Sequence, residues 1–115
     1  MARLFTAKDT VHDLMDRAQE LLDEEEPGKA LKIGQELERR CFSGAFEIQA
    51  LALVAMDRLK EAIETLKRGV SLAPQAWVLW QQLGNCQSDA GLYASALHAY
   101  DAALQVEGAD PVQLA

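Results

Sequence analysis

The sequence predicts an all-α fold built from three helical hairpins. Alanine and leucine are common among the 115 residues, whereas β-branched and aromatic residues are sparse, which favours helix over strand. Similar segments also recur, because Ala62 of LKEAIETL and Ala96 of YASALHAY lie 34 residues apart, and Ala30 of PGKALKIG lies 32 residues before Ala62. Each alanine sits early in a helix that follows a short break and an earlier amphipathic helix. The repeating unit is therefore a pair of helices.

Periodic apolar positions predict helices over residues 7–24, 28–41, 44–56, 59–72, 75–90 and 92–107. Thr6, with Asp9 three residues later, resembles a capping box at the start of the first helix. Pro27 and Pro74 suit first helical turns, where the missing N–H costs nothing, and Ser43 can cap the third helix. Asp110–Pro111 is a further start signal, so residues 109–115 are expected to begin a truncated or capping helix.

The third hairpin carries the most specific pattern: Trp80, Leu83, Gly84, Gly91, Tyr93, Ala96, Tyr100 and Ala103. This spacing closely resembles the tetratricopeptide repeat, whose period is about 34 residues. Gln87 is a departure, since the family has a tyrosine three residues after the glycine. The middle unit stays in register through Phe46, Ala50, Leu53, Leu59, Ala62, Leu66 and Pro74. The first unit resembles the family mainly by its period, through Leu14, Ala18, Leu21, Ala30 and Leu37.

The resemblance covers about residues 9–110 and implies a right-handed α-solenoid of three antiparallel helix-turn-helix hairpins. The expected units are 9–42, 43–74 and 75–108, within a single domain over residues 1–115. Gly84 and Ala96 are expected to meet where two helices come closest, because small side chains let backbones approach. The family also implies an inner groove, lined by the first helix of each hairpin, that takes an extended peptide or a partner helix.

Helical spacing assigns to this groove His12, Met15, Asp16, Gln19, Glu47, Leu51, Val54, Val78, Gln81, Gln82, Asn85, Ser88 and Asp89. The same positions also fit an ordinary polar helix face that binds nothing. Co-chaperone members of the family bind a carboxylate tail with Lys, Arg and Asn. Of these three residue types, only the Asn has a counterpart in this sequence, Asn85. Because Asp16, Glu47 and Asp89 would repel an acidic tail, the expected partners are neutral, apolar or basic peptides.

The last predicted helix is apolar over most of its circumference. Its polar residues before Glu107 form one narrow stripe of Ser95, His98, Asp101 and Gln105, besides the tyrosine hydroxyls. Such a helix is normally covered on more than one side. We therefore expect a self-association surface around Ala94, Leu97, Leu104 and Val106. Its partner is either a second copy, as in a homodimer, or a following helix.

Composition and motifs argue against several other functions. The net charge of −7 disfavours nucleic acid, and no apolar run is long enough to cross a membrane. Without a secretory signal, the two cysteines are expected to be free thiols in a reducing compartment, so the cytoplasm is predicted. Cys86 is expected to be a buried small thiol. With His12 and His98 far apart, and without metal-ligand or phosphate-loop spacing, we expect no catalytic site, metal or cofactor.

These patterns together predict a non-catalytic protein–protein interaction module that serves as a scaffold or adaptor. A small three-repeat secretion-type chaperone for an apolar client segment is one alternative. A regulatory domain cut from a larger multidomain protein is the other. Trp77 either covers the end of the preceding hairpin or anchors a partner.

Overall fold

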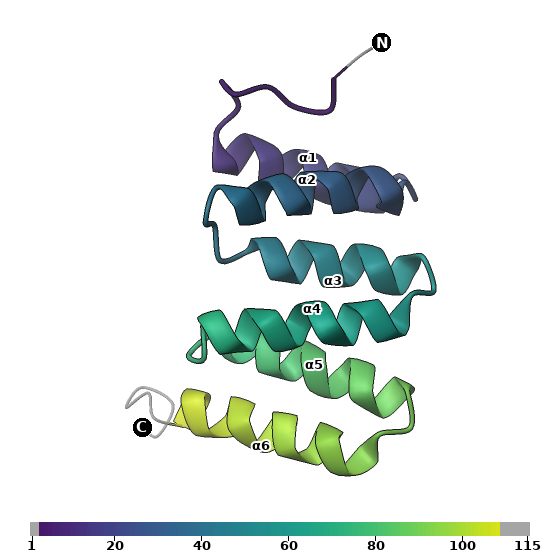
Figure 1. Ribbon diagram of the computed structural model, residues 1–115, viewed down its shortest axis with the longest axis vertical. Coiled ribbons are helices and arrows are strands. Elements are labelled where there is room, and N and C mark those ends of the chain that lie inside the picture. Colours follow the sequence, from purple (N-terminus) through teal and green to yellow (C-terminus); the bar gives the residue numbers. More distant parts are fainter. Residues whose placement is uncertain (1–2, 109–115) are drawn as a thin grey trace. The chain divides into compact units, whose positions relative to one another are not determined.

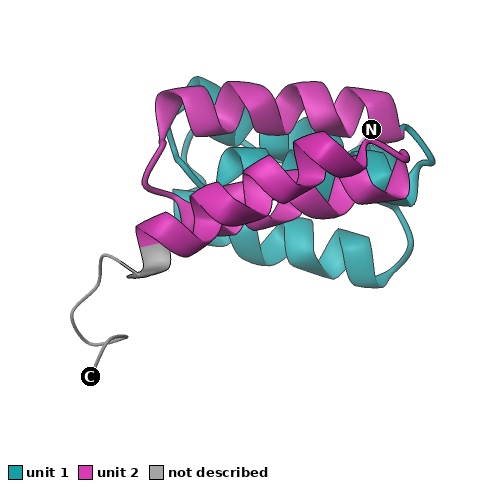
Figure 2. Cartoon of the chain, turned by 90° about the horizontal axis from the view of Figure 1, so that it is seen from below, with its two compact units in different colours: residues 1–58 teal, residues 59–115 magenta. Residues whose placement is uncertain are grey.

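The structure is a computed structural model that describes residues 3–108, and the regular secondary structure within these residues is all α-helix (Figure 1). The helices are α1 (Val11–Asp23), α2 (Pro27–Arg39), α3 (Ala45–Ala55), α4 (Leu59–Leu72), α5 (Trp77–Asp89) and α6 (Tyr93–Gly108). The chain divides into unit 1, residues 1–58, and unit 2, residues 59–115 (Figure 2). Within each unit, successive helices pack against one another. The all-α prediction is confirmed, and this sequential pairing is consistent with a repeat of helical hairpins.

Unit 1 holds α1, α2 and α3, and α1 contacts both of the other helices. Helices α1 and α2 each turn one apolar face inward, with core positions three and four residues apart, whereas most residues of α3 are buried. The buried core consists of Leu14, Ala18 and Leu21 of α1, Ala30, Ile33 and Leu37 of α2, and Ala45, Ile48 and Ala52 of α3. The alanines are fully buried, so small side chains allow the three helices to pack closely.

The closest approach of α2 and α3 lies at Gly34. A Cβ atom on Gly34 would come within 2.7 Å of Gln49 Cγ, nearer than real Cβ contacts allow. The Gln49 side chain is buried, and its Nε2 donates to the Gly34 carbonyl at 3.2 Å and to Glu38 Oε1 at 2.8 Å. These two bonds satisfy the buried amide nitrogen, which would otherwise cost about 1–3 kcal/mol. The sequence pattern did not reveal this contact.

The first helix begins four residues later than predicted. Thr6 and Asp9 do interact, since the Thr6 N–H donates to Asp9 Oδ2 at 2.8 Å, but they close a turn before the helix. The capping box of α1 is formed instead by Thr10 and Asp13. The Asp13 N–H donates to Thr10 Oγ1 at 3.1 Å, and the Thr10 N–H donates to Asp13 Oδ2 at 3.1 Å. The same three-residue spacing occurs twice in succession, and the second instance starts the helix.

Unit 2 holds α4, α5 and α6, with α5 packed against both neighbours. Five residues of α4 were expected on its inner side, and of these Leu59 is partly buried, whereas the others are buried: Ala62, Ile63, Leu66 and Val70. On α5 the buried residues include Leu79, Leu83 and Cys86, and on α6 they are Ala96, Ala99 and Ala103. Among the described residues of α6, only alanines are buried, so its large apolar side chains lie elsewhere on its surface.

The contact at Gly84 differs from the predicted one. A Cβ atom on Gly84 would come within 2.7 Å of Tyr100 Cε1 and 2.8 Å of Tyr100 Cδ1. The aromatic ring of Tyr100, rather than Ala96, therefore occupies the space that the glycine leaves. The Tyr100 hydroxyl donates to Asn85 Oδ1 at 2.6 Å, which holds the ring in place beside α5. Ala96 is buried at 2% exposure, as expected for a small residue on the inner face of α6.

Four helix ends share one backbone geometry. The residues with positive φ that follow α1, α2, α3 and α5 are Glu25, Cys41, Asp57 and Gly91. In each, the next residue donates its N–H to a carbonyl five residues earlier, as Leu92 does to Gln87 at 2.8 Å. This is the Schellman arrangement, which satisfies carbonyls that the helix end leaves free. Three of these turns, at residues 25, 57 and 91, repeat at intervals of 32 and 34, like the alanines.

Besides Thr6, two further cap predictions are wrong, and one lies outside the described residues. Ser43 does not cap α3, because Gly44 holds the N-cap position and no side chain bonds there. Pro74 precedes the first turn of α5, which begins at Trp77. Pro27 does occupy the first turn of α2. The start signal at Asp110–Pro111 lies outside residues 3–108. The solenoid, its handedness and the three unit boundaries stay predictions.

Candidate functional site

The predicted groove residues of unit 1 lie on α1 and α3, two helices that contact each other. His12, Asp16 and Gln19 of α1 are exposed, whereas Met15 is partly buried and packs against the core. On α3, Glu47 is partly buried, and Leu51 and Val54 are large apolar residues with 39% and 43% exposure. We call this set, without Met15, the α1–α3 face.

The remaining groove residues lie on α5 in unit 2. Gln81, Asn85 and Asp89 are exposed, and Val78, Gln82 and Ser88 are partly buried. Asn85, the one counterpart of a carboxylate-gripping residue, accepts the hydroxyl hydrogen of Tyr100. Its Oδ1 therefore bonds to α6, whereas the part of the amide that can donate to a carboxylate is Nδ2. Gln82 has a buried Oε1 that accepts no hydrogen bond, so this oxygen could accept one from a ligand.

The predicted self-association surface is largely exposed. Leu97 and Leu104 are 69% and 64% exposed, and Ala94 is also exposed, whereas Val106 is partly buried. Tyr93, one turn before Leu97, adds a further exposed ring at 67%. The exposed residues spaced four and seven apart lie along one side of α6. Whether this stripe self-associates stays a prediction.

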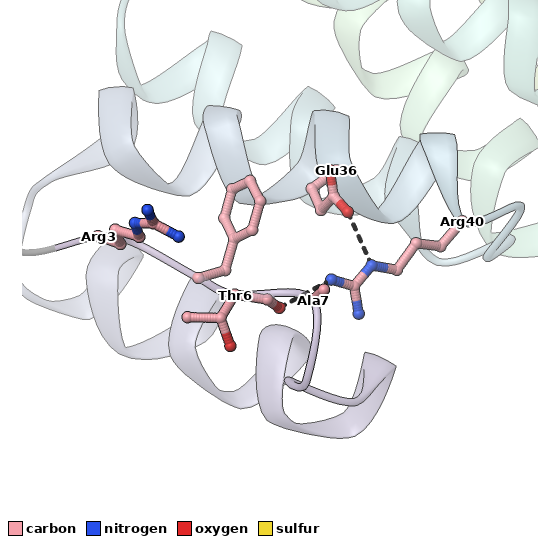
Figure 3. A pocket seen from close by; sticks show the side chains of 6 residues that line it. Arg3, Thr6, Ala7, Glu36 and Arg40 are labelled. Atoms are coloured by element: carbon pink, nitrogen blue, oxygen red, sulfur yellow. Dashed lines mark hydrogen bonds and ion pairs between the residues drawn. The ribbon is translucent and has the colours of Figure 1, made fainter.

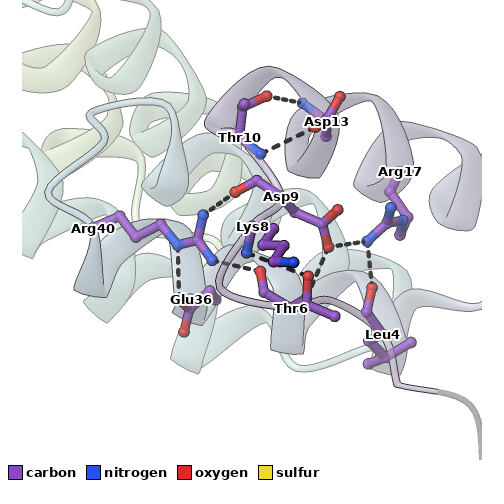
Figure 4. Close-up of polar contacts among 9 residues, drawn as sticks. All are labelled: Leu4, Thr6, Lys8, Asp9, Thr10, Asp13, Arg17, Glu36 and Arg40. Atoms are coloured by element: carbon purple, nitrogen blue, oxygen red, sulfur yellow. Dashed lines mark hydrogen bonds and ion pairs between the residues drawn. The ribbon is translucent and has the colours of Figure 1, made fainter.

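Two arginines, Arg17 of α1 and Arg40 at the end of α2, hold the N-terminal segment, residues 3–10, against the helices of unit 1 (Figure 4). Arg17 Nη1 donates to the Leu4 carbonyl at 2.6 Å and to Asp9 Oδ2 at 3.1 Å. Arg40 donates to the carbonyls of Asp9 and Thr6, the latter at 3.1 Å. Because both guanidinium groups bind backbone oxygens, they fix the path of an otherwise irregular segment. Leu4 and Phe5 of this segment pack against the unit 1 core.

Arginine side chains lower the pKa of two carboxyl groups, those of Asp9 and Glu36. The hydrogen bond from Arg17, with help from the Thr6 N–H, lowers the pKa of Asp9. Hydrogen bonds from Arg40 and then Arg39 lower the pKa of Glu36.

A pocket of about 530 Å³ opens beside the N-terminal segment (Figure 3). Its lining consists of Arg3, Phe5, Thr6, Ala7, Glu36 and Arg40. In this lining Glu36 Oε2 and Arg40 Nε form an ion pair at 2.8 Å, so each charge is already paired within the protein.

A second pocket lies within unit 2, with a volume of about 520 Å³, and we call it the α4–α6 pocket. It is lined by Lys67, Val70, Trp80, Leu83, Gln87, Ala94, Ser95, His98 and Ala99. The floor is apolar, and the polar members come from all three helices of the unit. Trp80 is held by a hydrogen bond from Nε1 to the Pro74 carbonyl at 2.8 Å. No sequence pattern indicated this pocket, because its lining joins residues far apart in the chain.

The thiols and histidines show no paired arrangement of nucleophile and base. Cys86 is buried, as predicted, and burial raises its pKa, which disfavours the reactive thiolate. Cys41 is exposed at the end of α2. His12 and His98 are both exposed. Across residues 3–108, no three His, Cys, Asp or Glu side chains gather as they would around a metal ion.

The arginine contacts of the N-terminal segment are a further feature that the sequence interpretation missed. The spacing of Glu36 and Arg40 signals an ion pair on one helix. Nothing in the spacing signals that Arg40 also reaches backbone oxygens 31 and 34 residues away. None of the helices in the described part of the chain is long and apolar enough to span a membrane. A comparison with protein-family models and with curated protein sequences gives no match.

Proposed function

We propose that this chain is a non-catalytic protein–protein interaction module of the tetratricopeptide type, a right-handed array of three helical hairpins. The repeated spacing of its alanines and the matching Schellman turns support the repeat. In this proposal the α1–α3 face of unit 1 binds an extended peptide or a partner helix, and the predicted residues of α5 in unit 2 also take part in binding.

The observation that carries the proposal is the exposure of Leu51 and Val54. Both are on α3, three residues apart, and neither contributes to the buried core. Asp16 and Gln19 of the neighbouring α1 are also exposed, so polar groups lie on the adjoining helix. An apolar patch flanked by polar groups is typical of a recognition surface. The nearby carboxylates favour neutral, apolar or basic peptides.

A peptide array tests the proposal. The labelled chain is compared with Leu51→Asp and with Leu72→Asp, which introduces the same charge at a leucine that is 73% exposed at the end of α4. Binding that is lost in Leu51→Asp and kept in Leu72→Asp would support the α1–α3 face. The binding of basic peptides in that set should weaken with added salt, because salt near physiological ionic strength screens charges over about 8–10 Å.

Either of two results would contradict the proposal. The first is that both variants bind every peptide as the parent chain does. The second is that the peptides whose binding depends on Leu51 are acidic. Circular dichroism of the two variants establishes that each keeps its helices.

The second candidate function is a chaperone for an apolar client segment, and the exposed apolar residues along one side of α6 favour it. Tyr93, Leu97 and Leu104 are all more than 60% exposed on a helix with few charges. A second copy of the chain is the simplest cover for this stripe in the absence of a client. Sedimentation should then show association that Leu104→Glu abolishes. A concentration-independent monomer would contradict this self-association. A regulatory domain of a larger protein remains compatible with either surface.

A further inference from the structure

The α4–α6 pocket contains a buried amide whose hydrogen-bonding capacity is unused. Gln87 is 5% exposed, and its Oε1 is buried without a hydrogen-bond donor. Buried polar groups nearly always have partners, because leaving one unpaired costs about 1–3 kcal/mol. The backbone of Gln87 cannot easily move away, since its carbonyl accepts the Leu92 N–H in the turn after α5. An unpaired amide fixed in the wall of a pocket indicates a place for a ligand.

The charge around the pocket narrows the chemistry of this ligand. Lys67 of α4 and His98 of α6 line it, and its lining contains no Asp or Glu, although the chain has a net charge of −7. Lys67 Nζ lies 3.8 Å from Glu64 Oε1, close to the outer limit of an ion pair, so a ligand carboxylate can compete for it. Ser95 adds a hydroxyl donor. The rim therefore favours an anionic group.

The floor of the pocket favours an apolar group beside that anion. Val70, Leu83 and Ala99 are buried there, and the ring of Trp80 is oriented by its bond to the Pro74 carbonyl. The volume of about 520 Å³ falls within the range of about 300–1,000 Å³ that is usual for small-ligand sites. It suits a short run of side chains better than a whole helix.

We infer that the α4–α6 pocket binds an acidic peptide segment of a partner protein, with a leucine-like side chain on the floor and an adjacent carboxylate at Lys67. A peptide meets each requirement of the site, because its backbone N–H can satisfy Gln87 Oε1 while its acidic side chain pairs with Lys67. A rotation of the Gln87 amide about its last bond exchanges donor and acceptor, so a backbone carbonyl can also be bound. This site lies within unit 2 and does not depend on the α1–α3 face.

Trp80 fluorescence provides the assay. The Trp77→Phe variant leaves Trp80 as the only tryptophan, because the chain has two. The probe is the capped peptide acetyl-GLELG-amide, and acetyl-GLQLG-amide is its uncharged match. We expect a saturable change in emission with the acidic peptide, and a dissociation constant about two- to fivefold higher for the uncharged one, the value of a surface ion pair.

Two variants assign the contacts. Lys67→Gln should abolish the preference for the acidic peptide, whereas Lys60→Gln, an exposed lysine of α4 outside the pocket, should leave it unchanged. Gln87→Leu roughly keeps the size of the side chain and removes the amide, so it should weaken the binding of both peptides to the same extent. Leu51→Asp, made in the same background, should change neither affinity. The result with Leu51→Asp separates this site from the α1–α3 face.

Three outcomes would overturn the inference. In the first, neither peptide changes the emission of Trp80 at millimolar concentration. In the second, both peptides bind equally well, or the preference survives Lys67→Gln. In the third, hexanoate binds as tightly as the acidic peptide, since a free carboxylate would then suffice and a peptide would not be the preferred ligand.

Discussion

Replacing Gly84 with alanine tests the packing of α5 against α6. The new Cβ would lie 2.7 Å from Tyr100 Cε1, whereas ordinary contacts begin at 3.4 Å, so the ring must retreat by about 0.7 Å. Its hydroxyl bond to Asn85, at 2.6 Å, opposes this movement. Overpacking costs about 1–3 kcal/mol, and alanine recovers about 1 kcal/mol of helix propensity. We expect a net loss of about 1 kcal/mol, or about 4–8 °C in the melting temperature.

A double-mutant cycle isolates the cause of this loss. In a Tyr100→Ala background the obstacle is gone, so Gly84→Ala should raise the stability by up to about 1 kcal/mol. The interaction energy of the cycle should therefore be about 1–3 kcal/mol. Thermal and urea unfolding followed by circular dichroism provide the measurement. If Gly84→Ala stabilises the parent chain as much as it stabilises the Tyr100→Ala variant, the ring does not occupy this space and the reasoning is refuted.

Three further predictions concern the helix ends, the thiols and the N-terminal segment. Gly91→Ala should cost about 1 kcal/mol, because φ is +81° there although space is open, whereas Gly28→Ala, also in open space but at ordinary φ, should cost nothing in urea unfolding. Cys41 should react promptly with a disulfide reagent and Cys86 only on unfolding, as the time course of absorbance will show. The lowered pKa of Asp9 means that its contribution to stability is present above about pH 4 and lost as the pH falls further, so the NMR signals of residues 6–9 should move to random-coil positions in acid before those of α1.

Apolar spacing within one helix was sufficient to predict which side of that helix is buried. On α4 the spacing of five apolar residues places them on one face, and Ala62, Ile63, Leu66 and Val70 are buried there, whereas Leu59 in the first turn is partly buried. The reason is physical, because helical geometry fixes the directions of side chains three and four residues apart. Helix ends were also found to within about four residues. The capping box at Thr10 was missed only because an earlier Thr–Asp pair has the same spacing.

Contacts between helices could not be predicted in the same way. The spacing of Gly84 indicates a close approach but does not say that the Tyr100 ring, rather than Ala96, fills the space. Which side chain fills the space depends on the rotamer of Tyr100 and on the hydrogen bond from its hydroxyl to Asn85. Likewise, the bonds from Gln49 to α2 and from Arg40 to the N-terminal segment join residues far apart in the chain. The α4–α6 pocket has the same origin, because three helices contribute to its lining.

An NMR titration tests the proposed interaction surface most directly. The isotope-labelled chain is titrated with the array peptide whose binding depends most on Leu51. We predict that the largest shifts fall on the exposed residues of the α1–α3 face, namely His12, Asp16, Gln19, Leu51 and Val54. They should disappear in Leu51→Asp and persist in Leu72→Asp. Shifts confined to other surfaces would contradict the proposal, as would the absence of any array peptide that requires Leu51.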